Sequence, residues 1–141
     1  MSDTQLCTFV VGKLLCGVSV LDVQEVLRES EITTVPLADP AVRGLLNLRG
    51  DVIAAIDLRR RLNLPDRDPN AGQSHVIIRA GDEAVSLLVD AVEDVITVSS
   101  ASFEAPPQTV MGAPRAFIVG VHKLESRLLL VLDAKRVASP T

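Results

Sequence analysis

Histidine, cysteine, carboxylate and arginine side chains are the groups that could do chemistry in this chain of 141 residues. The two histidines are His75 and His122, and no Ser or Cys stands in a nucleophile-elbow context such as G-x-S-x-G. A zinc site would need more ligands of this kind, and neither phosphate-loop pattern, G-x-G-x-x-G or G-x-x-x-x-G-K-[ST], occurs. The sequence therefore predicts no enzyme activity, no metal and no cofactor, with both histidines at strand edges or on the surface.

Charged clusters point to structural roles. The carboxylates of Asp90, Glu93 and Asp94 are expected on a solvated face or turn, because acidic residues are rarely buried without a partner. The triplet at residues 59–61 is all arginine and follows Asp57, a candidate helix N-cap. Favourable placement near the C-terminus of a short helix explains these arginines better than phosphate binding does.

One polar pair fits a binding site as well as it fits a solvated surface. Asn47 and Arg49 lie in an otherwise apolar run at residues 44–50. Side chains alternate along a strand with period two, so these two are predicted to share a face. The residues alone leave both interpretations open.

Short strands joined by tight turns must position these side chains. Apolar runs flank glycine-containing or polar turns in four hairpin patterns. The pairs of runs are 9–11 with 14–18, 44–48 with 52–56, 76–78 with 85–89, and 118–124 with 128–132. With residues 32–35 and 92–98 they give about ten strands, a pattern typical of small barrels or a sandwich.

Helices are expected to be few and short. The spacing of Val20, Val23, Val26 and Leu27 predicts one helix over residues 20–28. Short helices are also predicted at 58–62 and 133–137, where Asp57 and Asp133 each follow an apolar strand, which suggests a weak internal duplication. Residues 65–74 are the best linker candidate and 105–114, with three prolines, form a second long loop. We therefore expect a single domain over residues 1–141, made of two small β-barrels divided near residues 65–74.

Composition excludes several classes of partner. The formal net charge is −4, the wrong sign for a protein that binds a phosphate backbone. With three Phe and no Trp or Tyr, the chain cannot build base-stacking platforms in number. Cys7 and Cys16 lack a secretory segment ahead of them, and the longest early apolar stretch, 14–21, is too short to cross a bilayer. We expect a cytoplasmic protein that does not bind nucleic acid.

The chain resembles the CheW family, adaptors that couple chemoreceptors to the histidine kinase CheA in bacterial chemosensory arrays. Residues 44–59 are similar to the family signature G-x-x-N-L-R-G-x-x-x-P-x-x-D-L-R, the most specific of the matching blocks. Residues 89–95 resemble its V-D-x-V-x-D-V block, and 120–133 its ending G-V-x-x-L-x-x-R-L-L-x-L-L-D. Residues 21–26 add a match to its helix motif, so the resemblance covers nearly the whole chain.

The resemblance implies an all-β fold with short helices, in which two five-stranded SH3-like β-barrels pack into one compact unit. It also implies a noncatalytic adaptor at receptor arrays that meets the membrane only through receptors. A groove between the barrels would receive the cytoplasmic tip of a chemoreceptor, and one barrel end would dock on the regulatory domain of a CheA-type kinase. The implied receptor-binding residues are Val23, Glu25, Asn47, Arg49 and Gly50. The implied kinase-binding residues are Gly44, Leu45 and Leu46.

Three positions depart from the family pattern. Ala54 stands where the signature usually has Pro, Cys16 where an aromatic residue is frequent, and Ser126 where the last hairpin often has Gly. These departures leave an alternative: a divergent CheW-like module of an accessory motility pathway that binds only one of the two partners.

Overall fold

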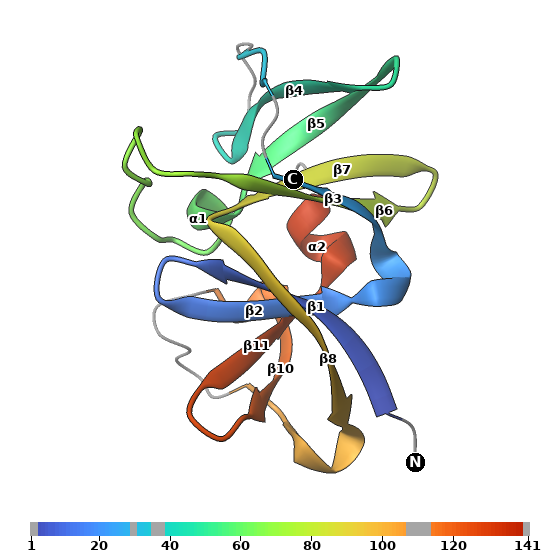
Figure 1. Cartoon of the computed structure of the whole chain (residues 1–141), viewed down its shortest axis with the longest axis vertical. Coiled ribbons are helices and arrows are strands. Elements are labelled where there is room, and N and C mark those ends of the chain that lie inside the picture. The colour runs from blue at the N-terminus through green and yellow to red at the C-terminus, as the bar shows by residue number, and fades with distance from the viewer. Residues whose placement is uncertain (1–2, 29–30, 35–38, 107–113, 140–141) are drawn as a thin grey trace.

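The computed structural model describes residues 3–28, 31–34, 39–106 and 114–139, and its described part is mostly strand (Figure 1). The strands are β1 (Asp3–Val11), β2 (Leu14–Ser19), β3 (Val23–Leu27), β4 (Val42–Leu48), β5 (Asp51–Asp57), β6 (Ser74–Ala80), β7 (Glu83–Val89), β8 (Ala91–Ser99), β9 (Phe103–Glu104), β10 (Ile118–Lys123) and β11 (Leu128–Leu132). The helices are α1 (Leu58–Arg61) and α2 (Ala134–Ala138), with 3₁₀ turns η1 (Val20–Asp22), η2 (Ser100–Ser102) and η3 (Arg115–Phe117).

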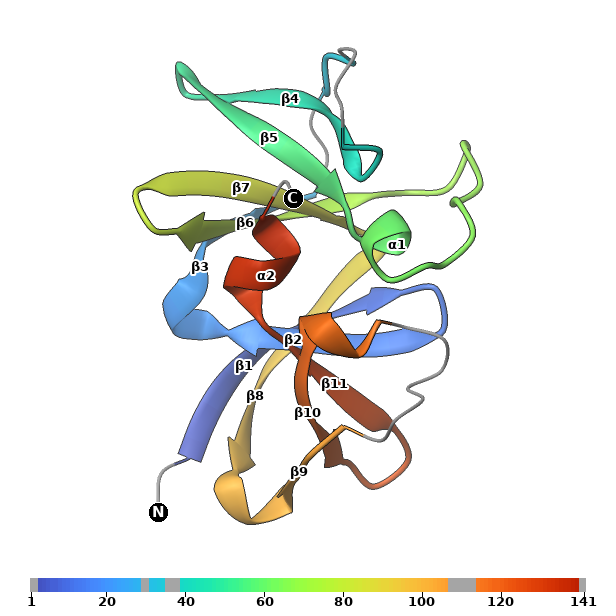
Figure 2. The same cartoon turned by 180° about the vertical axis from the view of Figure 1, so that it is seen from behind.

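These strands form two mixed sheets. One sheet has six strands in the order β8-β1-β2-β11-β10-β9, and the other has five in the order β3-β6-β7-β5-β4. The five-stranded sheet lies in the upper half of Figure 1 and the six-stranded sheet in the lower half, with α1 and α2 between them. Figure 2 shows the same layering from behind. The all-β class with short helices is confirmed. The six-stranded sheet exceeds the expected five strands because β9 adds a two-residue edge to β10.

All four predicted hairpins are present as antiparallel pairs: β1 with β2, β4 with β5, β6 with β7, and β10 with β11. The main core lies between the two sheets, where apolar residues of both pack together with α1 and α2. Phe9, Leu58, Leu87 and Val137 are fully buried there. Two smaller apolar clusters lie elsewhere, one made from the six-stranded sheet around Leu129 and one from the five-stranded sheet. Hydrophobic burial in the main core holds the two sheets together, and each smaller cluster stabilises its own sheet.

Both predicted helix starts are confirmed. Asp57 caps α1 by accepting a hydrogen bond from the Arg59 N–H at 3.0 Å, and Asp133 caps α2 by accepting one from the Arg136 N–H at 3.2 Å. In each sheet, the strand before the cap forms a parallel pair, β5 with β7 and β11 with β2. The two strand-Asp-helix units therefore occupy equivalent places in their sheets, as the internal duplication predicts.

The predicted helix over residues 20–28 is wrong. Only η1 (Val20–Asp22) is helical, and β3 follows it, paired with β6 from Val23↔Ile78 to Leu27↔His75. A helix of that length would be marginal in isolation because nucleation is costly. The edge of β6 instead gives the β-branched Val23 and Val26 a ladder to join. Tertiary pairing thus overrides a helical spacing of apolar residues.

In place of the strand expected over residues 32–35, the structure has a single β-bridge, between Thr33 and Leu45. Val35 lies outside the described residues. Thr33 and Leu45 exchange two backbone hydrogen bonds of 2.8 Å. This bridge pairs the chain segment after β3 with β4, the other edge strand of the five-stranded sheet. The segment that follows one edge strand thus pairs with the other edge strand, which begins to close the sheet into a barrel. Most of the predicted loop 105–114 also lies outside the described residues.

The sheets do not divide at residues 65–74. β5 and β6 lie on either side of that segment and belong to the same sheet. The chain instead passes from one sheet to the other at η1 (Val20–Asp22) and between β7 and β8. The two sheets are intertwined because β1 and β2 precede the five-stranded sheet in sequence while β8 to β11 follow it.

Asp90 stands at the second crossing and ties three segments together. Its carboxylate accepts two hydrogen bonds from Arg59 of α1, at 3.0 and 2.6 Å. It also accepts one from the Gly12 N–H in the β1–β2 turn at 2.8 Å. Arg61 lies near the C-terminal end of α2, where it donates to the carbonyl oxygens of Val137 and Ser139. Arg59 and Arg61 were expected to stabilise the C-terminus of their own short helix. Both instead bind groups of other elements, Arg59 the carboxylate of Asp90 and Arg61 the carbonyl oxygens at the end of α2.

Candidate functional site

The turn between β4 and β5 is a two-residue hairpin loop. Leu48 pairs with Asp51, which leaves Arg49 and Gly50 as the central residues, at φ 52° and 91°. Two positive φ values in a two-residue loop are typical of a type I′ turn, whose twist matches that of the strands. Arg49 therefore adopts a left-handed conformation that non-glycine residues rarely use. The Asn47 side-chain oxygen accepts a hydrogen bond from the Gly50 N–H at 3.0 Å, which holds the turn.

Arg49 forms a two-point ion pair with Glu25 of β3. Its two terminal nitrogens donate to the two carboxylate oxygens at 2.5 and 2.8 Å. The hydrogen bond from Arg49 lowers the pKa of Glu25 and raises that of Arg49. The Arg49 side chain stays 69% exposed, whereas that of Glu25 is 20% exposed. Glu25 takes two of the five guanidinium N–H groups and fixes the plane of the group, so three donors stay available on an exposed side chain.

Of the five expected receptor-binding residues, the structure brings four together and sets one apart. Glu25, Asn47, Arg49 and Gly50 are joined by the hydrogen bonds just described. Val23 pairs with Ile78 and packs on the main core, whereas Glu25 pairs with Ile77 of the five-stranded sheet's own cluster. A register shift between Val23 and Glu25 turns their side chains to opposite faces of β3.

The three expected kinase-binding residues differ in their exposure. Gly44 is buried beneath the segment before β4, and a Cβ there would lie 2.3 Å from the Thr33 carbonyl oxygen. Leu46 is 1% exposed and packs inside the five-stranded sheet with Ile53 and Ile77. Leu45 is half-buried and reaches the surface. Gly44 and Leu46 therefore shape the strand, and Leu45 is the member of the set that a partner can touch.

Leu45 belongs to an apolar outer face of the β4–β5 hairpin. It pairs with Ala54, and Asn47 pairs with Val52, so all four side chains share one face. Val52 is 65% exposed, and Ala54 is half-buried. Ala54 is the position where the family signature usually has Pro. This face, hereafter the hairpin face, continues directly into the Arg49 turn.

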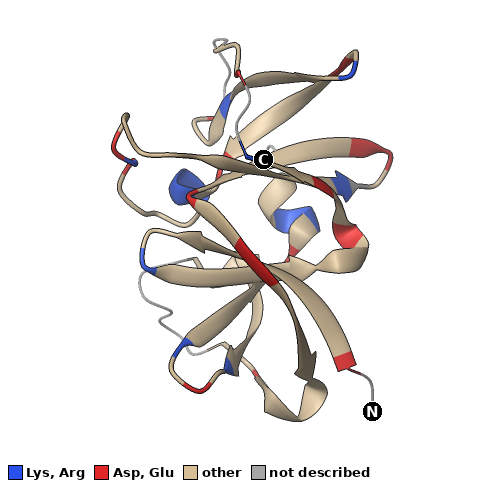
Figure 3. Cartoon of the chain, in the orientation of Figure 1, with Lys and Arg blue, Asp and Glu red and all other residues tan. Residues whose placement is uncertain are grey.

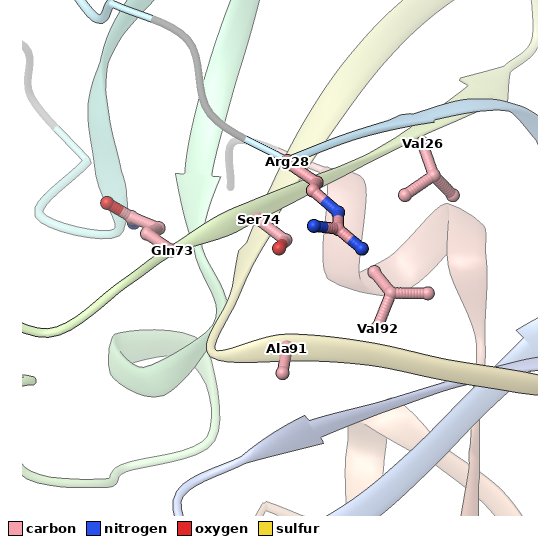
Figure 4. A pocket seen from close by; sticks show the side chains of 6 residues that line it. All are labelled: Val26, Arg28, Gln73, Ser74, Ala91 and Val92. Carbon is pink, nitrogen blue, oxygen red and sulfur yellow. The ribbon is translucent and has the colours of Figure 1, made fainter.

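A separate pocket of about 740 Å³ lies where the two sheets meet. Its lining comes from β3 with the residue after it, from the start of β6 with the residue before it, and from the start of β8 (Figure 4). The lining residues are Val26, Arg28, Gln73, Ser74, Ala91 and Val92. Sequence reasoning missed all of them as site residues. The V-D-x-V-x-D-V block, which contains Ala91 and Val92, was the available signal, but the helix predicted for residues 20–28 hid the role of Val26 and Arg28.

The histidines were predicted at strand edges or on the surface, but both are buried, in strands β6 and β10 that are paired on both sides. His75 is 1% exposed and lies 3.0 Å from the Ser86 hydroxyl; His122 is 4% exposed and lies 2.8 Å from the Ser102 hydroxyl. Burial lowers the pKa of His122. Among the residues that the structure describes, no group of three or more His, Cys, Asp and Glu could hold a metal ion. No helix in the described ranges is long and apolar enough to cross a membrane.

Comparison with known proteins gives one consistent family. The model of the CheW-like domain matches residues 5–140. The chain is 35% identical to chemotaxis protein CheW of Bacillus subtilis, across 94% of this chain and 85% of that protein. It is 30% identical to chemotaxis protein CheW of Treponema pallidum, across 96% and 82%.

The fold agrees with a solved structure. The scaffolding protein TtCheW from Thermoanaerobacter tengcongensis superposes with a TM-score of 0.86 and 28% identity, covering 97% of this chain and 88% of that one. The resemblance seen in the sequence motifs is thereby confirmed over nearly the full length. The chain belongs to the CheW family of noncatalytic chemotaxis scaffolding proteins.

Proposed function

We propose that this protein couples the cytoplasmic tips of chemoreceptors to the regulatory domain of a CheA-type histidine kinase. The observation that carries the proposal is the meeting of Glu25, Asn47, Arg49 and Gly50 at one exposed corner, since these residues come from two strands distant in sequence. Four of the five residues that the family resemblance selects for the receptor thus form one surface, and Val23 packs on the main core instead. A scaffold acts through such surfaces. These partners would place the protein at receptor arrays, where it reaches the membrane only through the receptors.

The Arg49 corner suits recognition of receptor carboxylates or carbonyls. A guanidinium has five N–H donors in one plane; Glu25 binds two of them and fixes that plane before binding, and the remaining three can donate to a partner. Less conformational freedom is then lost when a partner arrives. The left-handed backbone of Arg49 adds local strain, which supports a role at this position other than forming the turn.

The hairpin face suits the kinase. Leu45, Val52 and Ala54 make an apolar strip on two paired strands, and a regulatory domain of similar barrel fold can pack against it by side-chain contact. Gly44 and Leu46 support this contact from beneath because both are buried. The two proposed surfaces adjoin at Asn47, so one protein can hold both partners close together.

A ternary binding experiment tests the proposal. The purified chain is mixed with a receptor cytoplasmic fragment and the kinase regulatory domain from the same organism, and complexes are separated by size. Recovery of all three components together supports the adaptor function. Binding of only one partner supports the alternative, a CheW-like module of an accessory pathway, and binding of neither overturns both.

Matched variants assign the surfaces. Val52→Glu places a charge on the hairpin face and should abolish kinase binding while receptor binding persists. Val119→Glu is the control, because Val119 is 49% exposed on β10 in the other sheet. Equal effects of the two variants would remove the hairpin face from the kinase site.

A further inference from the structure

The two strand-Asp-helix units correspond to each other in detail. Asp57 and Asp133 each cap a short helix, and each also forms an ion pair with the arginine three residues later. The distance is 3.8 Å from Arg60 Nε to the Asp57 carboxylate and 3.7 Å from Arg136 Nε to the Asp133 carboxylate. The two caps are therefore equivalent points at which the surroundings of one unit match those of the other.

The units differ at a bulge in the strand beside each cap. β4 pairs with β5 and β10 pairs with β11, and each carries one extra residue near its start. The extra residue is Arg43 in β4, where it donates to Asp57 at 2.7 Å, and Val119 in β10. Because Val119 has no donor, Arg136 is the one ion-pair partner that Asp133 has among the described residues. The Asp57 side chain is 5% exposed, and that of Asp133 is 35% exposed.

A pocket of about 300 Å³, hereafter the Asp133 pocket, lies where Arg43 would have its counterpart. Its lining combines an apolar wall, to which Leu6, Val119 and Leu132 belong, with the charged residues Asp22, Asp133 and Lys135. Asp22 and Lys135 form no ion pair with each other or with another residue of the described ranges. The volume is at the lower end for ligand sites, so the pocket suits one long side chain better than a cofactor.

Acidic residues occur at turns and strands of both sheets in Figure 3, so a carboxylate alone does not mark a site. The Asp133 pocket stands out because the equivalent place in the other unit holds a guanidinium, that of Arg43. An arginine side chain has the two parts that this lining needs. Its methylene stem covers apolar surface such as Val119, which is 49% exposed, and its guanidinium binds a carboxylate at two points.

From this correspondence we infer that the Asp133 pocket receives an arginine side chain from a protein partner. The guanidinium binds Asp133 as Arg43 binds Asp57, and the stem lies along Val119. Asp22 adds a second carboxylate, and Lys135 is exposed, so its ammonium can stay in solvent. The pocket belongs to the six-stranded sheet, whereas the Arg49 corner and the hairpin face belong to the five-stranded sheet. The inference therefore goes beyond the proposed function and does not rest on it.

A titration followed by backbone amide NMR tests the chemistry of the pocket. The probe is N-acetylarginine methylamide, and N-acetylcitrulline methylamide is its uncharged analogue of similar shape. We expect saturable shifts at the amides of Val119, Asp133 and Lys135, with at least about fivefold higher affinity for the arginine probe, because only the guanidinium makes charge-assisted hydrogen bonds. The corresponding lysine compound should bind more weakly than the arginine probe, because an ammonium lacks the planar fork.

A charge variant assigns the site. Asp133→Asn removes the carboxylate but keeps the helix cap, since Asn and Asp are equally good N-cap residues. It should lower the affinity for the arginine probe by about fivefold or more. Asp82→Asn is the matched control, because Asp82 is exposed in the turn between β6 and β7 of the other sheet. Its affinity should stay within about twofold of that of the unmodified protein.

Val119→Arg gives the six-stranded unit the equivalent of Arg43. The new side chain should fill the pocket, so the arginine probe should no longer bind. The variant should also melt at a higher temperature than Val119→Gln, which has a polar side chain without the charge. That difference should disappear when Asp133→Asn is added to both, because the cycle of variants isolates the pair. Val119 is exposed, so these variants are expected to fold.

Each outcome has one meaning. Equal affinity for the arginine and citrulline probes, unchanged affinity of Asp133→Asn, or binding that persists in Val119→Arg overturns the inference. Tighter binding of free arginine than of the blocked probe would indicate a free amino acid as ligand, and a dimer that Asp133→Asn dissociates would indicate a second copy of the chain. Both results overturn the assignment to a protein partner. None of them affects the proposed coupling function, which the ternary binding experiment tests separately.

Discussion

Glu25 and Arg49 are 24 residues apart in sequence, yet their side chains meet in a two-point ion pair at 2.5 and 2.8 Å. Glu25 lies on β3 and Arg49 follows β4, the two edge strands of the five-stranded sheet. The pair therefore links the edges of that sheet at the surface, and the Thr33–Leu45 bridge joins the segment after β3 to β4 through the backbone. A partner that binds this corner meets a charge pair already in place.

Loss of Arg49 is expected to weaken receptor binding more than folding. Its side chain is 69% exposed, and exposed ion pairs contribute little to stability, so Arg49→Ala should change the melting temperature by no more than a few degrees. Truncation of a central interface arginine commonly reduces affinity by about thirtyfold. Calorimetric titration with a receptor cytoplasmic fragment and a melting curve measure the two effects.

Lys123→Ala is the control for this prediction, because Lys123 forms an exposed ion pair with Glu104 in the other sheet. It should leave both measurements unchanged. Unaltered receptor affinity of Arg49→Ala would remove Arg49 from the site, and a collapsed melting curve would make it a structural residue.

Asp90 is expected to make stability depend on acid pH. Burial raises the pKa of its carboxyl, but the hydrogen bonds from Arg59 and the Gly12 N–H outweigh burial and lower the pKa overall. The native state then binds fewer protons than the unfolded chain, so this stabilisation is complete above about pH 5 and is lost as the pH falls through the carboxyl range. Asp90→Asn should cost about 1 to 2 kcal/mol at pH 7, and less near pH 3.

Urea unfolding of Asp90→Asn and the unmodified protein at both pH values measures that difference. Asp66→Asn serves as a comparison, since Asp66 is 64% exposed in its pair with Arg60 and should change stability little at either pH. A difference between Asp90→Asn and the unmodified protein that stays constant with pH would contradict the prediction.

The two helix caps should differ in their contribution to stability. Asp57 is 3% exposed and also binds Arg43 at 2.7 Å, whereas the Asp133 side chain is 35% exposed. Asp57→Ala removes a cap and leaves Arg43 without its partner, so it should cost about 3 kcal/mol. Asp133→Ala should cost about 1 kcal/mol. Chemical denaturation of the two variants compares them, and equal costs would show that Arg43 adds nothing to the cap.

Gly44 and Leu45, neighbours in the family signature, should separate folding from binding. Gly44→Ala would place a Cβ 2.3 Å from the Thr33 carbonyl oxygen, so the bridge to Leu45 must shift, and the variant should lose about 2 kcal/mol or more of stability. Leu45→Ala should fold with a smaller loss and bind the kinase regulatory domain more weakly. Denaturation and binding assays on both variants test this, and a stable Gly44→Ala that fails to bind would reverse the assignment.

Local patterns in the sequence were sufficient for much of the fold. The hairpins follow from apolar runs separated by turn residues, because register and turn are set within about ten residues. The caps at Asp57 and Asp133 follow from an acidic residue placed directly after an apolar strand. The signature at residues 44–59 is specific enough to indicate the family, and the match of the CheW-like domain over residues 5–140 confirms it.

Long-range contacts decided what those patterns could not. Residues 20–28 have apolar spacing compatible with a helix, and the open edge of β6 made residues 23–27 a strand. The formation of this strand places Glu25 against Arg49, and it places Arg28 in the lining of the pocket where the two sheets meet. The sequence by itself determined the hairpins, the caps, the family and the residues at the Arg49 turn. The tertiary structure decided which of them lie buried, as Gly44 and Leu46 do, and which share a surface, because pairing between distant strands depends on partners that no local window contains.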